Sequence, residues 1–174
     1  AICTGSTYTL ANAMAANYQS LLWSTNGDGF FDDASQLQPT YTPGNADISS
    51  GTVDLCLTAN AFNPCLDAQG CMMLTIIPQA TASAGDEAQI CEGSDYYLGD
   101  AYATNFSTLL WTGGDGEFDD ANQIQASYQP GEEDIAQGYA ELCLTAEPIE
   151  PCSVSAEDCM MLTIIPQATA SAGD

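Results

Sequence analysis

The chain repeats itself with a period of about 87 residues, and this internal repeat constrains its fold more than any other feature. Cys71–Asp86 recurs letter for letter as Cys159–Asp174. A period of this length is the size of a small domain, and it is too long for one coil of a solenoid. We therefore predict two domains of the same design, residues 1–86 and residues 87–174.

Strand and turn patterns fill each half of the chain. Apolar and polar residues alternate along Thr52–Ala59 and along Cys71–Ile77, which is typical of β-strands. Turn-forming residues stand at Asn26–Gly29 and Thr42–Gly44, and we expect a single helical turn only at Asp47–Gly51. Several short strands within each repeat predict an all-β fold, namely two tandem Ig-like β-sandwich domains.

The charge of the chain excludes several classes of function. There are 24 Asp and Glu residues and no Lys, Arg or His, which gives a formal net charge of −24. Nucleic acids and anionic membrane surfaces require cationic contacts, and no apolar run is long enough to span a bilayer. A Ser–His or Cys–His nucleophile cannot be built. A carboxylate pair of the glycosidase type is the remaining catalytic option, but we interpret the acids as solvated surface and cation ligands and predict no enzyme.

The cysteine content indicates where the protein resides. Each half carries four of the eight cysteines, which is typical of disulfides formed in an oxidising compartment. Zinc is the weaker alternative, because the chain has no C-x-x-C pair and no His. We therefore predict an extracellular or cell-surface location.

Strand register predicts how the cysteines pair. When Cys56 lies opposite Cys71 in an antiparallel hairpin, Leu55 lies opposite Met72 and the apolar residues share one face. The second half obeys the same register, so we expect these bridges on the outer face of each sheet. The remaining pairs follow by elimination and tie the first strand of each half to its last loop. The predicted disulfides are Cys56–Cys71, Cys143–Cys159, Cys3–Cys65 and Cys91–Cys152.

Four sequence blocks carry a resemblance to a known family. They are ICTGSTYTL (Ile2–Leu10), LLWSTNGDGFFDDA (Leu21–Ala34), YTPGNADISSG (Tyr41–Gly51) and the final LTI strand, each with a counterpart in the second half. Together they resemble the tandem Ig-like (PKD-like) repeats of bacterial cell-surface and secreted adhesins. The resemblance implies an Ig-like sandwich, an extracellular stalk, fibre or adhesive array, and no catalytic residues. The chain departs from the family in lacking basic residues and in having a second disulfide per repeat, which indicates a more rigid assembly.

Clustered acids suggest a bound cation. A net charge of −24 repels itself, so copies that pack side by side need counterions. Calcium accepts several carboxylate and carbonyl oxygens in irregular geometry. The alternative is a set of polar turns and a solvated linker, since no segment has the spacing of an EF-hand loop. The candidate Ca²⁺ ligands are Asp28, Asp32, Asp33, Asp47, Asp86, Glu87, Asp115, Asp119, Asp120 and Asp134.

These observations predict a structural tandem-repeat unit of an extracellular bacterial filament or surface stalk, stabilised by disulfides and Ca²⁺, whose partners are further copies of itself. The alternative is a ligand- or carbohydrate-binding adhesin module with an aromatic platform at Tyr97, Tyr102 and Phe106. Copies join either covalently or by association. In the second case, Ala80–Asp86 of a preceding copy is positioned to complete the very short first strand at Ala1–Ile2.

Overall fold

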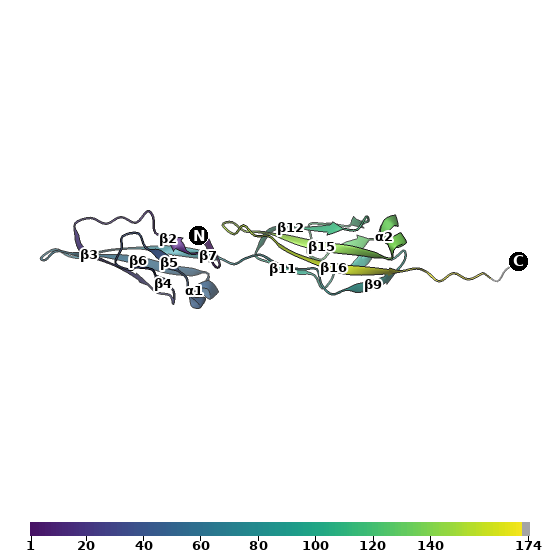
Figure 1. Ribbon diagram of the computed structural model, residues 1–174, viewed down its shortest axis with the longest axis horizontal. Helices are drawn as coiled ribbons and strands as arrows, with labels where there is room; N and C mark the ends of the chain where they lie inside the picture. Colours follow the sequence, from purple (N-terminus) through teal and green to yellow (C-terminus); the bar gives the residue numbers. More distant parts are fainter. Residues whose placement is uncertain (172–174) are drawn as a thin grey trace. The chain divides into compact units, whose positions relative to one another are not determined.

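The computed structural model describes residues 1–171 and divides them into two compact units (Figure 1). The first unit is Ala1–Pro78 together with Glu150–Cys152. The second unit begins at Gln79 and contains the rest of the described chain. Each unit is an Ig-like β-sandwich, as the alternating sequence pattern predicts.

The first unit contains a four-stranded and a three-stranded sheet. The four-stranded sheet has the order β1-β7-β6-β3 and is antiparallel except for β1 and β7, which run parallel. Its strands are β1 Ile2–Cys3, β3 Tyr18–Thr25, β6 Thr52–Ala61 and β7 Ala68–Ile77. The second sheet has the order β2-β5-β4, with β2 Tyr8–Thr9, β4 Phe30–Phe31 and β5 Thr40–Thr42. The predicted helical turn is α1, Asn45–Ser50, and it ends at Gly51.

The second unit repeats this plan. Its larger sheet has the order β12-β15-β16-β9, with β9 Ala88–Cys91, β12 Phe106–Gly113, β15 Tyr139–Pro148 and β16 Ala156–Ile165. Its smaller sheet has the order β10-β14-β13, with β10 Tyr96–Tyr97, β13 Glu117–Phe118 and β14 Ser127–Gln129. The helix α2 is Glu132–Gln137. Neither described helix has the length and apolar character that a membrane span requires.

The second unit has one additional pair of strands. Strand β8, Thr81–Ser83, runs antiparallel to β11, Tyr102–Thr104. The sequence repeat placed the domain boundary after Asp86, whereas the first unit ends at Pro78. The difference arises because β8 pairs within the second unit instead of finishing the first.

Alternation along β6 and β15 determines which side chains enter the cores. In β6, Val53, Leu55 and Leu57 are buried, and each is followed by a more exposed residue. The core of the first unit also contains the ring of Trp23, whose indole N–H donates a 3.1 Å hydrogen bond to the carbonyl oxygen of Gln36. An indole is well suited to a core position where its one donor is satisfied. Trp111 occupies the same position in the second unit.

Candidate functional site

Two disulfides hold the long hairpins of the sandwiches, in the register that the sequence predicts. Cys56 lies opposite Cys71 and is bonded to it, with 4.1 Å between their Cα atoms. Cys143 and Cys159 form the matching bridge, with 4.0 Å between their Cα atoms. Leu55 next to Cys56 is fully buried while Cys71 is exposed, so the first of these bridges lies on the outer face of its sheet.

The other two predicted disulfides are wrong. Cys3 is bonded to Cys152, which lies 149 residues further along the chain, and Cys65 and Cys91 are free and exposed. Elimination assumed that each repeat closes its own bridges. Instead, Glu150–Cys152, from the loop between β15 and β16, packs as part of the first unit and takes the place expected for Cys65.

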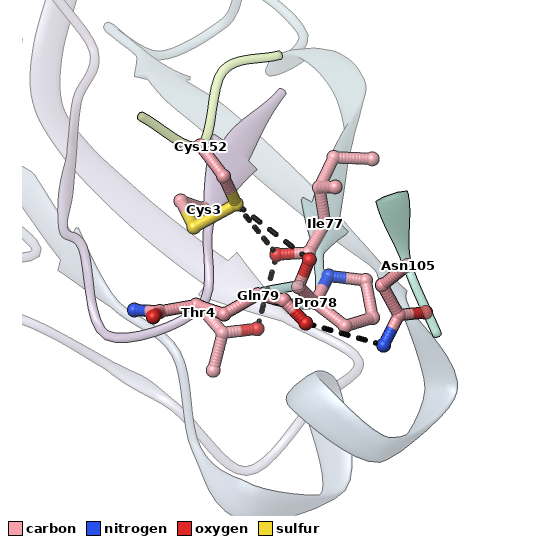
Figure 2. The surroundings of a disulfide bond; sticks show 7 residues. All are labelled: Cys3, Thr4, Ile77, Pro78, Gln79, Asn105 and Cys152. Atoms are coloured by element: carbon pink, nitrogen blue, oxygen red, sulfur yellow. Dashed lines mark hydrogen bonds between the residues drawn. A yellow bond between two sulfur atoms is a disulfide. The ribbon is translucent and has the colours of Figure 1, made fainter. Parts of the chain in front are cut away.

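The Cys3–Cys152 disulfide lies beside the end of β7 (Figure 2). Cys3 is paired in register with Ile77, and the Sγ atom of Cys152 lies 3.5 Å from the carbonyl oxygen of Ile77 and 3.6 Å from that of Pro78. The backbone N–H and the hydroxyl of Thr4 both donate to the Ile77 carbonyl, at 2.9 and 3.1 Å. Only 5 % of Cys152 is exposed, so this bridge is part of the packed structure of the first unit.

The acid cluster of the first unit centres on a buried carboxylate. Asp47 is 2 % exposed, and its Oδ2 accepts a 2.6 Å hydrogen bond from the hydroxyl of Tyr41. The same oxygen accepts from the backbone N–H of Gly29 and Gly44, and Oδ1 accepts from that of Asp28. Buried carboxylates require such donors. Burial raises the pKa of Tyr41 to about 12, and its hydrogen bond to Asp47 adds to the shift.

Asp28 and Asp33 stabilise the start of α1 and a surface turn by accepting hydrogen bonds. Asp28 accepts hydrogen bonds from the backbone N–H of Ala46 and Asp47 at the start of α1, and the bond from Ala46 is the main reason why the pKa of Asp28 is lowered. Asp33 accepts from the hydroxyl and the backbone N–H of Ser35, and chiefly that hydroxyl lowers the pKa of Asp33. Acids that accept backbone hydrogen bonds at helix starts and turns are common stabilising features.

The second unit reproduces this arrangement with its own residues. Tyr128 donates its hydroxyl to the buried carboxylate of Asp134, and burial is the main cause of the raised pKa of Tyr128. Asp115 accepts from the N–H of Glu133 and Asp134, and the bond from Glu133 is the main cause of its lowered pKa. Asp32, Asp119 and Asp120 each accept a backbone hydrogen bond within their own turn, and Asp32 and Asp119 also accept one from the first residue of β5 and of β14.

The glycines of the Gly-Asp-Gly turn are required by this packing. A Cβ atom on Gly27 would lie 1.7 Å from Oδ1 of Asp47, and one on Gly29 would lie 2.3 Å from the hydroxyl oxygen of Tyr41. The motif that we interpreted as calcium-directed therefore brings a backbone turn close to a buried carboxylate. Sequence reasoning missed the tyrosine–aspartate pair, although the shared Y-x-P-G-x-x-D spacing from Tyr41 to Asp47 signals it.

Within residues 1–171 the acids do not assemble into a metal centre. Among the described residues, no group of three or more His, Cys, Asp or Glu side chains is placed to hold an ion. The oxygens of Asp28 and Asp47 already accept hydrogen bonds, and Asp86 and Glu87 are exposed in the segment between β8 and β9. The donor set therefore does not fit a Ca²⁺ ion held by several protein carboxylates.

A groove opens on the first unit. Its volume is about 480 Å³, and the side chains that line it are mainly apolar. They come from β2, β3, β6, β7 and the segment after β2, and they include Leu10, Met14, Trp23, Leu57, Ala59 and Met72. A second, open depression on the second unit is lined by Tyr97 and Tyr102, both 59 % exposed. Phe106, the third residue of the predicted aromatic platform, instead packs against the core.

Comparisons with known proteins identify a fold. No protein-family model matches the chain, and no curated protein matches it. A crystal structure of mouse cadherin-23 EC22-24 is similar, with a TM-score of 0.51 and 13 % identity over 84 % of this chain and 54 % of that one. The likeness is one of fold. Human mucin-like protocadherin EC1-2 gives a TM-score of 0.44 and 8 % identity over 86 % of both chains, and mouse protocadherin PcdhgC3 EC1-3 gives 0.47 and 12 % over 92 % of this chain and 62 % of that one. Cadherin-23 EC22-24 thus has the same Ig-like β-sandwich fold as this chain.

Proposed function

We propose that the chain is a structural tandem-repeat unit of an extracellular bacterial filament or surface stalk. The observation that carries this proposal is the Cys3–Cys152 disulfide. It links β1 of the first repeat to the loop that connects β15 and β16 of the second repeat. A bridge over 149 residues restricts the unfolded chain strongly. Such a covalent link between successive repeats suits a component that bears load.

The roles of the acidic residues and the cysteines support a structural function instead of catalysis. The buried acids, Asp47 and Asp134, are fully engaged as hydrogen-bond acceptors of the fold. The described chain offers no metal-binding cluster, and its sequence has no basic residue to hold an anionic substrate. Three disulfides fit an oxidising extracellular setting.

Divalent cations enter this proposal as counterions. A charge of −24 without any basic residue opposes the close approach of two copies. Calcium or magnesium at millimolar concentration screens this repulsion without a dedicated cage of ligands.

Electron microscopy of native material tests the structural role. We expect ordered fibres with an axial repeat of one or two sandwich domains, and reduction of the disulfides should weaken them. Native material that consists only of dispersed single chains would contradict the proposal.

A second candidate function is carbohydrate binding at the depression beside Tyr97 and Tyr102. Two exposed tyrosines next to the amides of Gln123 and Gln125 combine stacking surfaces with hydrogen-bonding groups. Glycan-array binding by the chain, lost in the Tyr97→Ala/Tyr102→Ala variant, would favour this function. Binding that survives the double substitution would exclude this depression.

A further inference from the structure

We propose that copies of this chain join head to tail, with the segment Gln167–Asp174 of one copy inserted as a strand into the groove of the next copy's first unit. In the same joint, Cys91 of the first copy forms a disulfide with Cys65 of the second. This inference rests on the proposed filament function and names how its subunits connect.

The groove lies where the second unit has an extra strand. In the second unit, β8 pairs with β11 and packs against β15 and β16. Ala84, just after β8, is 1 % exposed and belongs to the core. The counterpart of β11 in the first unit is the segment Met14–Ala16, which lines the groove and forms no strand among the described residues. The first unit is therefore an Ig-like sandwich that lacks one strand.

Burial differs between the two units as a missing strand predicts. Met160 is 3 % exposed, while its counterpart Met72 is only partly buried. Leu144 is 0 % exposed and its counterpart Leu57 is 8 % exposed. Met14 beside them is 88 % exposed. An uncovered apolar groove favours a strand that adds to the exposed edge, since such a strand gains backbone hydrogen bonds and buries alternate side chains.

The sequence of the chain identifies the occupant. Gln79–Asp86, which contains β8, is identical to Gln167–Asp174. Residues 166–171 are exposed and adopt no regular secondary structure (Figure 1). The small alanines at 168, 170 and 172 correspond to those at 80, 82 and 84. Gln167 donates hydrogen bonds to Glu92 of its own unit, which fixes where the segment leaves β16. The segment that completes the second unit within one chain thus has an identical counterpart, and we infer that this counterpart completes the first unit of another copy.

One contact of β8 has no equivalent in the groove. The backbone N–H of Ala84 donates a 2.8 Å hydrogen bond to the carboxylate of Asp158, and Gly70 stands at the corresponding position of the first unit. The added strand therefore depends on backbone pairing and apolar burial in this joint.

The free cysteines provide an independent indication of the same neighbour. Cys91 in β9 occupies the position of Cys3 in β1, since each of these strands runs parallel to the last strand of its sheet. Cys65 follows a proline in the loop between β6 and β7, as Cys152 follows one in the loop between β15 and β16. Cys3 and Cys152 are bonded, whereas Cys65 and Cys91 are free and exposed.

The surroundings of Cys65 are also those of an unpartnered contact. Phe62 and Leu66, in the same loop, are 58 % and 91 % exposed. The corresponding loop of the second unit also exposes Ile149 and Val154, at 40 % and 64 %, but its Cys152 is only 5 % exposed and belongs to the packed structure of the first unit. Exposed apolar side chains around a free thiol are typical of a surface that another copy covers.

Both observations select one direction of assembly. Within the chain, Gln79–Asp86 leaves the first repeat and supplies a strand to the second, and Cys152 of the second repeat bonds back to Cys3 of the first. Between copies, the same rule sends Gln167–Asp174 into the next copy's first unit, and Cys65 of that unit bonds back to Cys91. The strand insertion and the disulfide therefore predict the same order of copies in one joint.

The covalent step requires an oxidant. The thiol of Cys91 and the thiol of Cys65 lose two protons and two electrons and form one S–S bond. A disulfide such as oxidised glutathione accepts the electrons and protons and becomes two thiols. The strand holds the two cysteines together before the bond forms, which raises their effective concentration.

The first experiment tests the disulfide in solution with the whole chain. Cys65→Ser retains Cys91, and Cys91→Ser retains Cys65, so each variant alone should form no covalent dimer in oxidised glutathione, although its strand can still insert. Their mixture should give one covalent heterodimer and nothing larger, while the unsubstituted chain should give a ladder of oligomers on non-reducing gels. Homodimers of either single variant at the level of the heterodimer would overturn the proposal.

The second experiment tests the strand. The change is made in the Cys65→Ser chain, which donates the strand. When this chain ends at Pro166, it should fail to form the heterodimer with Cys91→Ser. Ala170→Trp in the same chain should also block the heterodimer, because Ala82 at the matching position packs against the core. Thr169→Ser is the control, since Thr81 at that position is exposed, and it should assemble like the unsubstituted chain. Equal assembly by the truncated chain would overturn the strand insertion.

A peptide with the sequence of Gln79–Ala88 separates the groove from the source of its strand. It should bind the truncated chain, perturb the NMR signals of groove residues such as Met72, and compete with assembly of the whole chain. Peptide binding without assembly of the whole chain would overturn a second copy as the source. Heterodimers that form in solution while native material contains no fibres would leave this joint intact and contradict the filament function.

Discussion

The hydroxyl of Tyr41 donates a 2.6 Å hydrogen bond to the buried carboxylate of Asp47, and Tyr128 and Asp134 repeat this contact in the second unit. Each pair joins the β-strand before the Pro-Gly turn to the first turn of the short helix. The pair anchors the Gly-Asp-Gly turn as well, because the same carboxylate accepts backbone N–H groups from it.

Removing this hydroxyl should destabilise the first unit. We expect Tyr41→Phe to lower the free energy of unfolding by about 1–3 kcal/mol, since a buried carboxylate loses a charge-assisted donor. Chemical denaturation monitored by tryptophan fluorescence measures the change. Tyr18→Phe is the matched control, because the hydroxyl of Tyr18 makes no hydrogen bond within residues 1–171. Equal losses in both variants would contradict a special role for the Tyr41–Asp47 pair.

The same pair predicts a loss of stability at alkaline pH. The pKa of Tyr41 is raised from 10.0 to about 12, so the folded state holds the phenol proton more tightly than the unfolded state does. This contribution is fully present below pH 10 and disappears as the pH rises from 10 to 12. Thermal melts at intervals across this window should show a steeper decline for the unsubstituted chain than for Tyr41→Phe. Parallel declines would show that Tyr41 is not the titrating group.

A methyl group on Gly27 should be poorly tolerated. Its Cβ would lie 1.7 Å from Oδ1 of Asp47, so either the turn or the buried carboxylate must move. We expect Gly27→Ala to lower the free energy of unfolding by about 1–3 kcal/mol. Gly70→Ala serves as the control, because no atom lies within 4 Å of the added methyl group. Urea denaturation of both variants measures the difference, and a neutral Gly27→Ala would argue against the close approach.

The pairing of Cys3 with Cys152 is open to direct mapping. The chain has no Lys or Arg, so the unreduced protein must be digested with a protease that cleaves at acidic residues instead of trypsin. Mass spectrometry should find Cys3 linked to Cys152, and Cys56 linked to Cys71. A peptide that links Cys3 to Cys65 would restore the arrangement deduced by elimination.

Removing these bridges should have unequal costs. In the loop-entropy model, the Cys56–Cys71 bridge contributes about 3 kcal/mol and the Cys3–Cys152 bridge about 5 kcal/mol, because the second closes a far longer loop. Double Cys→Ala variants of each pair, compared by denaturation, measure the two contributions. A larger loss from the hairpin bridge would contradict the loop-length argument.

Divalent cations should stabilise the chain weakly and without selectivity. The carboxylates of Asp28 and Asp47 are occupied by hydrogen-bond donors, so screening of the net charge is the main effect that remains. We expect Ca²⁺ and Mg²⁺ to raise the melting temperature alike, and sodium chloride to reproduce the effect at higher concentration. A saturable rise specific to Ca²⁺, reversed by a chelator, would instead establish a calcium site.

Local sequence patterns were sufficient for the architecture of each repeat. Alternation along Thr52–Ala59 predicts β6, and the apolar match between Leu55 and Met72 predicts the hairpin register that positions Cys56 against Cys71. Both depend on neighbouring strands whose side chains must share one face, and a slip by one residue would expose the core. Information of this kind is contained in short stretches of chain.

The sequence by itself determined that two like sandwiches exist, that they are acidic, and that two bridges close their hairpins. Only the tertiary structure decided the partner of Cys3, because the repeat makes Cys65 and Cys152 equivalent in sequence and the choice depends on which loop packs beside β7. It likewise decided that Asp47 is a buried acceptor and that the segment after Pro78 completes the second unit. These outcomes depend on contacts between residues far apart in the chain, which local periodicity does not encode.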